Sequence, residues 1–314
     1  MNYIIFDLEW NQSPCGPEYE NPRIPFEIIE IGAIKLNDKF EIVDEYSSIV
    51  KPRIYKRLHK HIRQMLNYDE EYLKTGRPFD MVCREFMKWC GTDFIFGTWG
   101  TSDLPQLQKN MDYYYMNKFS EPFKYYDIQS IFAEQEPELG SCKLEKAVKF
   151  LELPTDYTFH TAINDARYTA QIFQYLSKEN LDDHYCYDYY HEPKDKESEI
   201  HAFHHSYAEH ISRGFHQRND IMLDKDIMTL RCYKCRKKLS RKIKWFSNNQ
   251  STFLSVGHCW YHGYQKGILK IKVSNTGNYF AIKKVVPISK SEVDTVRQRQ
   301  LELREKRREK RKSH

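Results

Sequence analysis

The chain has 314 residues, of which 40% are apolar and 30% charged, a balance typical of a folded protein rather than a disordered one. No apolar run approaches the roughly 20 residues that a membrane-spanning helix needs, so no membrane partner is expected. The N-terminal stretch carries Asp7 and Glu9 and has no leading Lys or Arg, which argues against a signal peptide. Eight unevenly spaced cysteines favour a reducing, cytoplasmic environment with one local metal site over a disulfide framework.

The net charge of +5 hides a division along the chain. Residues 1–224 hold 25 Lys and Arg against 38 Asp and Glu, whereas residues 225–314 hold 24 against 6. A basic segment joined to an acidic body points to a polyanionic partner, most often nucleic acid. A solvated basic face without a partner is the alternative, but the aromatic residues within the basic stretch favour nucleic acid.

Strand and helix patterns alternate in residues 1–180, the first of four expected segments. Tyr3–Trp10, Glu27–Leu36 and Glu41–Val50 are rich in β-branched and aromatic residues, and their short connections predict an antiparallel trio of strands. Two short strands and four helices follow, and together they predict an α/β fold with a mixed sheet flanked by helices. The short strands are expected at 94–96 and 123–126, and the helices at 79–89, 104–116, 144–151 and 166–176.

Three further segments complete the chain. Residues 181–220 are predicted to contain a connecting helix, because apolar residues from Ile200 to Phe215 follow helical spacing. On such a helix His201 and His205 lie one turn apart and could bind a metal, although surface histidines explain the pair equally well. Residues 221–288 form a basic all-β module in which 270–284 reads as a hairpin. Residues 289–314 form a basic tail, either helical or disordered.

Asp7 and Glu9 are separated by one residue on the first expected strand. Side chains alternate along a strand, so these two carboxylates point the same way while Phe6 and Leu8 point to the other side. Two carboxylates at the end of an apolar strand repel each other and resist burial, and a divalent cation resolves that conflict. Two solvated acids at a strand end would explain this pair alone.

Two later acidic positions have weak signals of their own. Asp103 follows the strand at 94–96 and opens a helix, at the kind of strand-to-helix turn where α/β sheets place their sites. Ser102 or Thr101 can cap that helix, which leaves Asp103 free. His160 precedes another helix and Asp165 lies in its first turn. A histidine can accept a proton near neutral pH, but a capping acid and a surface histidine would look the same.

Taken in order, these motifs resemble those of the DEDDh exonucleases in the DnaQ-like superfamily. The likeness extends over residues 1 to about 178, and within the superfamily the chain resembles the branch of the Eri-like 3′→5′ exoribonucleases and the bacterial sporulation-kinase-inhibitor relatives. It includes Glu27–Ala33, Lys51-Pro52 and Thr98–Gly100. The resemblance implies an RNase H-like fold and release of 5′-mononucleotides from the 3′ end of single-stranded nucleic acid, with RNA preferred and DNA possible.

The resemblance also assigns roles to five residues. Asp7, Glu9 and Asp165 would hold one Mg²⁺ or Mn²⁺, and Asp7 would bridge to a second ion supported by Asp103. His160 would be the general base. Where many relatives have Thr after the first Glu, this chain has Trp10-Asn11, and Thr98 and Ser102 flank the second Asp in place of Asn and an aromatic. The candidates for gripping the terminal nucleotide are Leu8, Trp10, Trp99 and Ser102. A core or lid role fits Trp10 equally well.

Two pairs of metal-binding residues occur in the basic module. Cys232 and Cys235 form a CxxC, and Cys259 and His262 follow, a spacing that predicts a zinc-ribbon-like site holding one structural Zn²⁺. His258 is the competing fourth ligand. A redox pair or unrelated thiols are less favoured, because no thioredoxin-like unit surrounds the CxxC.

Basic residues crowd between the two ligand pairs, with a tryptophan beside them. Cations bind phosphates and aromatic rings stack on bases, so a nucleic-acid grip is predicted, although a zinc ribbon that contacts only protein stays open. The sequence identifies no protein partner. The grip residues are Lys237, Lys238, Arg241, Lys242 and Trp245.

Two alternatives to an exoribonuclease follow from the same residues. One is a catalytically weak regulatory protein that uses the fold to bind RNA or a protein, and an intact acidic set argues against it. The other is a DNA repair or proofreading exonuclease, which matched RNA and DNA substrates would separate from the first.

Overall fold

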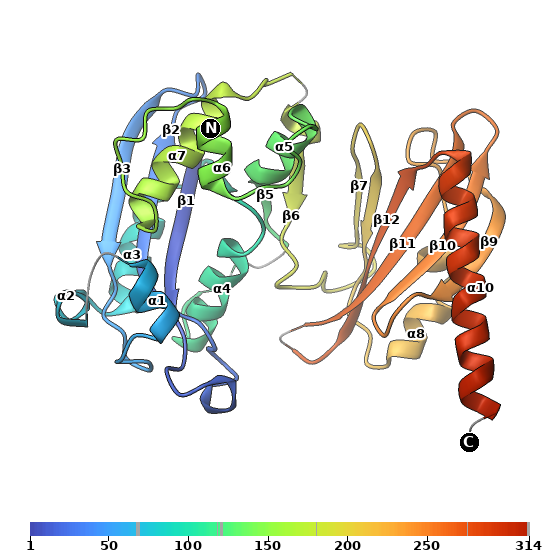
Figure 1. Cartoon of the computed structure of the whole chain (residues 1–314), viewed down its shortest axis with the longest axis horizontal. Helices are drawn as coiled ribbons and strands as arrows, with labels where there is room; N and C mark the ends of the chain where they lie inside the picture. Colours follow the sequence, from blue (N-terminus) through green and yellow to red (C-terminus); the bar gives the residue numbers. More distant parts are fainter. Residues whose placement is uncertain (67–69, 118, 120–121, 180, 275, 313–314) are drawn as a thin grey trace. The chain divides into compact units, whose positions relative to one another are not determined.

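The structure is a computed structural model that describes the chain except for residues 67–69, 118, 120–121, 180, 275 and 313–314. It divides into two compact units, Met1–Tyr190 and His191–His314 (Figure 1). Among the described residues, no helix combines the length and the apolar character needed to cross a bilayer.

The N-terminal unit is built on a six-stranded mixed sheet with the order β3-β2-β1-β4-β5-β6. The first three strands pair antiparallel, as predicted, while β4 is parallel to both β1 and β5. The short strand β6 closes the sheet antiparallel to β5. The strands are β1 Asn2–Asn11, β2 Glu27–Leu36, β3 Ile42–Ile49, β4 Phe94–Thr98, β5 Lys124–Asp127 and β6 Tyr185–Tyr187.

Helices cover both faces of this sheet, because β1 is apolar on both. Tyr3 and Ile5 pack under α5, α6 and α7, whereas Ile4 and Phe6 pack under α3 and α4 (Figure 1). The predicted mixed α/β fold is confirmed. The helices are α1 Lys60–Met65, α2 Glu70–Lys74, α3 Phe79–Cys90, α4 Asp103–Tyr113, α5 Ile128–Gln135, α6 Leu144–Phe150 and α7 Ala162–Tyr175, with 3-10 turns at Pro17–Tyr19 and Leu181–Asp183.

The C-terminal unit contains a second, antiparallel sheet with the order β7-β8-β12-β11-β10-β9. It is larger than the predicted module of short strands, because two strands come from the segment before it. The strands are β7 Ile200–Phe203, β8 Ala208–Ile211, β9 Ser240–Ser247, β10 Thr252–Cys259, β11 Gly263–Val273 and β12 Tyr279–Pro287, and the helices are α8 Arg218–Leu223, α9 Lys225–Met228 and α10 Lys290–Lys312.

The connecting helix predicted within 181–220 is wrong. Residues 200–211 form the β7–β8 hairpin, in which Ile200 pairs with Ile211 and His201 with His210. The turn is closed by the backbone N–H of His204, which donates to the carbonyl of Tyr207. Pairing of β8 with β12 stabilises this hairpin of four-residue strands. In so short a stretch, apolar residues are too few to distinguish the 3.6-residue period of a helix from the two-residue period of a strand. His201 and His205 therefore share no helix face.

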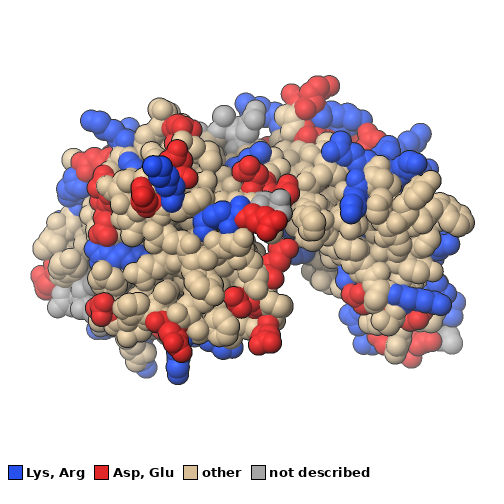
Figure 2. Space-filling view, turned by 90° about the horizontal axis from the view of Figure 1, so that it is seen from above, with Lys and Arg blue, Asp and Glu red and all other residues tan. Residues whose placement is uncertain are grey.

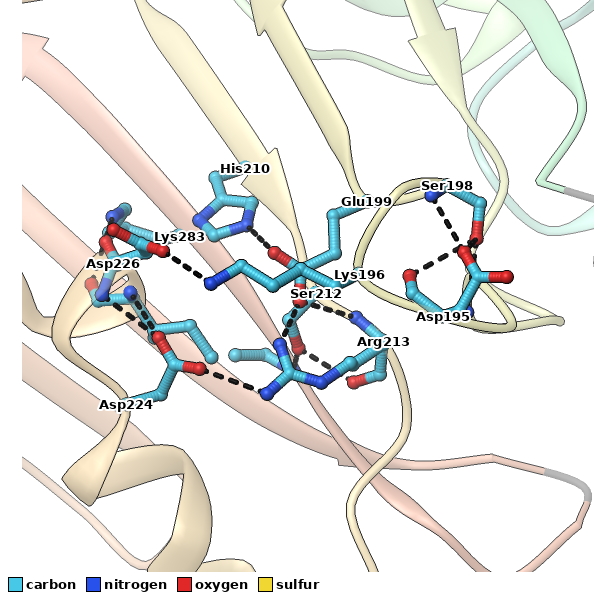
Figure 3. Close-up of polar contacts among 12 residues, drawn as sticks. Asp195, Lys196, Ser198, Glu199, His210, Ser212, Arg213, Asp224, Asp226 and Lys283 are labelled. Carbon is cyan, nitrogen blue, oxygen red and sulfur yellow. Dashed lines mark hydrogen bonds and ion pairs between the residues drawn. The ribbon is translucent and has the colours of Figure 1, made fainter.

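Buried charges join this hairpin to the rest of the unit (Figure 3). Glu199 accepts hydrogen bonds from Arg213 and from His210 at 2.9 Å. Lys283 on β12 donates to the carbonyls of Asp226, Ile227 and Thr229 at the end of α9, and burial lowers its pKa to about 8. Buried charges are tolerated where such partners satisfy them, so this network has a structural explanation.

The basic tail is a helix, one of its two predicted states. Val293 and Val296 of α10 pack against Ile243 and Val256 of the sheet. The two valines are one turn apart, so they form a narrow apolar stripe. Most of the other described side chains of α10 face solvent.

Candidate active site

Three carboxylates from distant parts of the chain meet on one face of the N-terminal sheet. Asp7 and Glu9 continue the odd-numbered face of β1, and α7 crosses this face with Asp165 in its first turn. Ligand oxygens of Asp7, Glu9 and Asp165 all lie within 4.8 Å of one another. The alternation on β1 and the helix that follows His160 therefore bring together residues 158 positions apart in sequence.

A glycine on β2 allows α7 to come this close. A Cβ atom on Gly32 would lie 2.1 Å from the backbone nitrogen of Ile163, so no side chain fits there. The backbone N–H of His160, a residue with a φ of 65°, donates to Oδ2 of Asp165 at 3.3 Å. Oδ1 of Asp165 is buried and has no hydrogen-bond partner within the described part of the chain. A buried acceptor without a donor is costly, and a bound cation would satisfy it.

Asp103 stands beside this group at the first residue of α4. Its Oδ1 accepts a hydrogen bond from the backbone N–H of Leu8 at 3.2 Å, which ties α4 to β1 next to Asp7. The predicted capping role of Ser102 is wrong, because Ser102 has helical backbone angles and its side chain makes no capping hydrogen bond. Asp103 is buried, and its role as a supporting acid stays a prediction.

Burial and mutual repulsion perturb all four acids. Burial is the largest cause in each case, and it raises the pKa of Glu9 to about 8 and those of Asp103 and Asp165 to about 7. The pKa of Asp7 is raised as well, by burial and then by the neighbouring carboxylates. Such a group is unstable when fully ionised, and divalent cations with oxygen ligands stabilise it. The acid set therefore fits a Mg²⁺ or Mn²⁺ site.

A fifth carboxylate, Glu30, was missed in the sequence analysis. Glu30 pairs with Glu9 across β1 and β2, is buried, and raises the pKa values of Asp7, Glu9 and Asp165. The two-residue period of β2 puts Glu30 on the same face as Gly32, but only the pairing of β1 with β2 places Glu30 opposite Glu9.

These pKa shifts predict how stability depends on pH. An unfolded Asp or Glu loses its proton near pH 4, whereas the folded site keeps protons up to about pH 7 or 8. The folded state binds more protons between these values, so raising the pH favours unfolding. Dialysed protein without Mg²⁺ is expected to show its highest Tm near pH 5. Between pH 5 and pH 8, the Tm should fall by about 2–4 °C for each kcal/mol by which the free energy of unfolding decreases.

Thermal melts followed by circular dichroism at several pH values would measure this effect. Added Mg²⁺ should raise the Tm most at pH 8, where the carboxylates are ionised. An Asp165→Asn variant should show a flatter profile. A Tm that climbs steadily from pH 5 to pH 8 in the Mg²⁺-free protein would contradict the expectation.

His160 lies at the rim of the acidic group. Its side chain is 41% exposed, and its Nε2 is 3.3 Å from Oε1 of Glu145 on α6. An exposed imidazole beside buried acids can exchange protons with solvent, which suits a general base.

Comparison with known proteins identifies this arrangement. A profile of the exonuclease family RNase_T matches residues 4–173, more than half of the chain. The chain belongs to this exonuclease family. The domain is of the DEDDh type, so the resemblance and the RNase H-like fold predicted from the sequence are confirmed.

Two curated relatives and one solved structure illustrate the likeness of the exonuclease domain. The chain is 29% identical over 187 residues to DNA polymerase III PolC-type of Clostridium perfringens, which covers 58% of the chain but only 12% of the polymerase. It is 26% identical over 180 residues to the probable 3′-5′ exonuclease KapD of Bacillus subtilis, covering 56% of the chain and 84% of KapD. The nuclease domain of 3′hExo, a DEDDh family member bound to rAMP, matches at 19% identity with a TM-score of 0.48, over 57% of this chain and 92% of that one.

The candidates for gripping a nucleotide in the exonuclease domain differ in exposure. Leu8 is buried in the core under α3 and α4, so little of its side chain is available. Trp10 is half-buried against Phe26, and Trp99 packs on Phe132 while its indole N–H donates to the carbonyl of Cys142. Ser102 is exposed. Contacts from Trp10, Trp99 and Ser102 to a nucleotide stay predictions.

A second group of metal-binding side chains lies in the C-terminal unit. Ligand atoms of Cys232, Cys235, Cys259 and His262 lie within 4.8 Å of one another. His262 Nδ1 is 3.4 Å from Cys232 Sγ and 3.6 Å from Cys259 Sγ. His258 is outside this group, because its ring packs against Tyr264 and Trp260.

Gln265 supports the cysteine group and had no signal in the sequence. It is fully buried, its Nε2 donates to Cys232 Sγ at 3.0 Å, and its Oε1 accepts from the backbone N–H of Tyr233. Burial raises the pKa of Cys232, but this hydrogen bond and those from backbone N–H groups outweigh burial and lower it to about 6. A thiolate at neutral pH is the form that binds zinc.

The predicted grip residues divide into two kinds. Trp245 is held in the sheet, because its indole N–H donates to the carbonyl of Met228 at 2.8 Å and its ring packs beside Leu230 and Leu269. The other four have exposed side chains; they are Lys237, Lys238, Arg241 and Lys242.

Proposed function

We propose that this protein is a metal-dependent 3′→5′ exonuclease that releases 5′-mononucleotides from single-stranded nucleic acid, with RNA preferred. The observation that carries the proposal is the convergence of Asp7, Glu9 and Asp165, where a buried oxygen of Asp165 has no hydrogen-bond partner among the residues that the structure describes. The exonuclease family supports the reaction class. The preference for RNA rests on the resemblance of the motifs to those of the Eri-like exoribonucleases.

Each acidic residue has a proposed task. Asp7, Glu9 and Asp165 would hold one divalent ion, and Asp7 would share a second with Asp103. When bound, two such ions stabilise the charges of the attacking and leaving oxygens in an in-line displacement at phosphorus. The hydrogen bond from Leu8 N–H holds Asp103 against β1, next in sequence to Asp7. His160 would accept the proton of the attacking water after its imidazole turns from Glu145 toward the acids.

The direct test uses single-stranded RNA labelled at the 3′ end or at the 5′ end. Incubation with Mg²⁺ or Mn²⁺ should release a labelled mononucleotide at once from the 3′-labelled strand and give a descending ladder from the 5′-labelled strand. Matched DNA tests the alternative that similarity to PolC-type polymerases raises. RNA or DNA that binds but stays intact with either metal would shift the assignment to a regulatory binding protein.

His160→Ala is expected to lower kcat by about 10²–10⁴-fold, the usual contribution of a general base. Binding of Mn²⁺ should persist, because the carboxylates are unchanged. Single-turnover rates and Mn²⁺ titration would measure the two properties. His184→Ala, which removes a histidine paired with Glu134 rather than with Glu145, is the matched control. Loss of Mn²⁺ binding in His160→Ala would show a structural role instead.

For the C-terminal unit we propose one structural Zn²⁺ held by Cys232, Cys235, Cys259 and His262, with the neighbouring basic residues binding nucleic acid. The sulfur and imidazole set matches tetrahedral zinc sites. The exonuclease domain would then occupy residues 1–180 and the basic unit would hold the substrate strand.

A further inference from the structure

The turn between β10 and β11 presents two aromatic side chains to solvent. Trp260 is 88% exposed and Tyr261 75%. The other four tryptophans of the chain are all partly buried. Because large aromatic rings usually gain free energy by burial, a largely exposed pair at one turn indicates a surface for binding.

The turn is held in a fixed shape. Cys259 pairs with Gly263 across a three-residue loop, and Gly263 has a φ of 68°, the left-handed conformation that such hairpin loops require. Cys259 and His262, which flank the two rings, belong to the cysteine group. A rigid loop loses little conformational entropy when its aromatic rings bind a ligand.

Cations lie on the loop beside this turn. The cysteine group brings the loop of residues 233–238 beside the turn, and Lys237 Nζ lies 5.0 Å from the centre of the Tyr261 ring. Lys234, Arg236 and Lys238 of the same loop are exposed. Residues 227–291 contain 14 Lys and Arg and no Asp or Glu. Figure 2 shows Lys and Arg side chains over the C-terminal unit, with groups of Asp and Glu side chains at the edges of that unit.

We propose that Trp260 and Tyr261 form a base-stacking site for single-stranded nucleic acid, with Lys237 and the neighbouring loop cations on the phosphates. Exposed aromatic rings and a basic stretch that contains no Asp or Glu are the two features that favour such binding. Trp245, the aromatic first expected in this role, is partly buried, and its indole N–H donates to the carbonyl of Met228. The inference rests on the proposed function in one respect: the bound strand is taken to be the exonuclease's substrate.

The proposal is tested by measuring nucleic-acid binding to the full chain carrying Asp7→Asn. This substitution prevents hydrolysis of the bound strand. A chelator is avoided because it would also remove metal from the cysteine group. Anisotropy would follow a fluorescein-labelled oligouridine of about 16 nucleotides, enough for one site of roughly 4–16 nucleotides. Trp260→Ala and Tyr261→Ala are each expected to weaken binding about tenfold. Trp260→Phe should bind the strand as the parent does, because phenylalanine also stacks on bases. It should lose the quenching of Trp260 fluorescence that strand binding is expected to cause in the parent. Tyr175→Ala, which removes an exposed ring on α7, should change nothing.

An abasic strand of the same length separates stacking from charge. It should bind Trp260→Ala and its parent equally, because it retains phosphates and lacks bases. The deoxy strand shows which sugar the site accepts, and a Trp260-dependent loss with either sugar supports the proposal. The proposal is overturned if Trp260→Ala binds the oligouridine and the deoxy strand as tightly as its parent does. It is also overturned if Trp260→Ala loses affinity only for phosphatidylserine vesicles, a result that would assign the turn to a membrane surface.

The outcomes also separate this inference from the proposed function. Shortening of RNA or DNA by the wild-type chain together with Trp260-independent binding would remove the stacking site alone. Trp260-dependent binding with no shortening in Mg²⁺ or Mn²⁺ would remove the catalytic proposal alone.

Discussion

Asp7→Asn is expected to lower mononucleotide release by more than about 10³-fold, because each divalent ion contributes several kcal/mol to the stabilisation of charge in the transition state. Asp7 is the residue expected to serve both ions, and it lies within 4.8 Å of Glu9 and Asp165. The amide keeps the shape of the carboxylate while removing its charge. Initial rates on 3′-labelled RNA, over a range of Mn²⁺ concentrations, would measure the loss.

The same substitution should raise stability when no Mg²⁺ is present. Burial and the neighbouring carboxylates raise the pKa of Asp7, so its ionised form destabilises the folded state at neutral pH. An amide removes that cost, and the Tm of Asp7→Asn should exceed that of the wild type at pH 8. Asp38→Asn, on an exposed position, should alter neither property. An inactive variant with a lower Tm would indicate misfolding and would not support a catalytic role.

The grouping of the acidic residues could be predicted from the sequence, because alternation along a strand determines the face to which each side chain points. Asp7 and Glu9 on β1 had to share a face, and ordered motifs linked them to Asp103 and Asp165. Glu30 was missed for a related reason: it faces the site only after β1 and β2 pair in one register. Register depends on contacts between distant residues, and a single strand's pattern does not reveal it.

The C-terminal unit was harder to predict, because its short elements are determined by tertiary pairing. Four residues from Ile200 and four from Ala208 form strands only because β8 adds to β12. The cysteine spacing did predict the group that the structure brings together. Spacing could not show which aromatic ring would stay exposed. Trp245 and Trp260 both follow cysteines in the sequence. They differ in exposure because Trp245 packs against Leu230 and Gly267, whereas Trp260 does not.

Replacing a ligand of the proposed zinc site should have the largest effect on folding. Cys232→Ser is expected to abolish the binding of one equivalent of Zn²⁺ and to unfold the region around the β10–β11 turn. Structural zinc sites of this kind contribute on the order of 10 kcal/mol of apparent binding free energy at neutral pH. Metal content by mass spectrometry and hydrogen exchange of residues 230–265 would measure the two effects.

Two comparisons make the zinc prediction specific. Cys15→Ser removes an exposed thiol outside the group and should leave one Zn²⁺ per chain. Gln265→Leu keeps all four ligands but removes the donor to Cys232 and the acceptor for Tyr233, so it should weaken Zn²⁺ binding by about 10–100-fold. The separate core around Ile221, Ile227 and Leu269 should preserve the rest of the sheet. Full retention of order in metal-free Cys232→Ser would mean that sheet pairing alone holds the turn, and zinc would then be dispensable for folding.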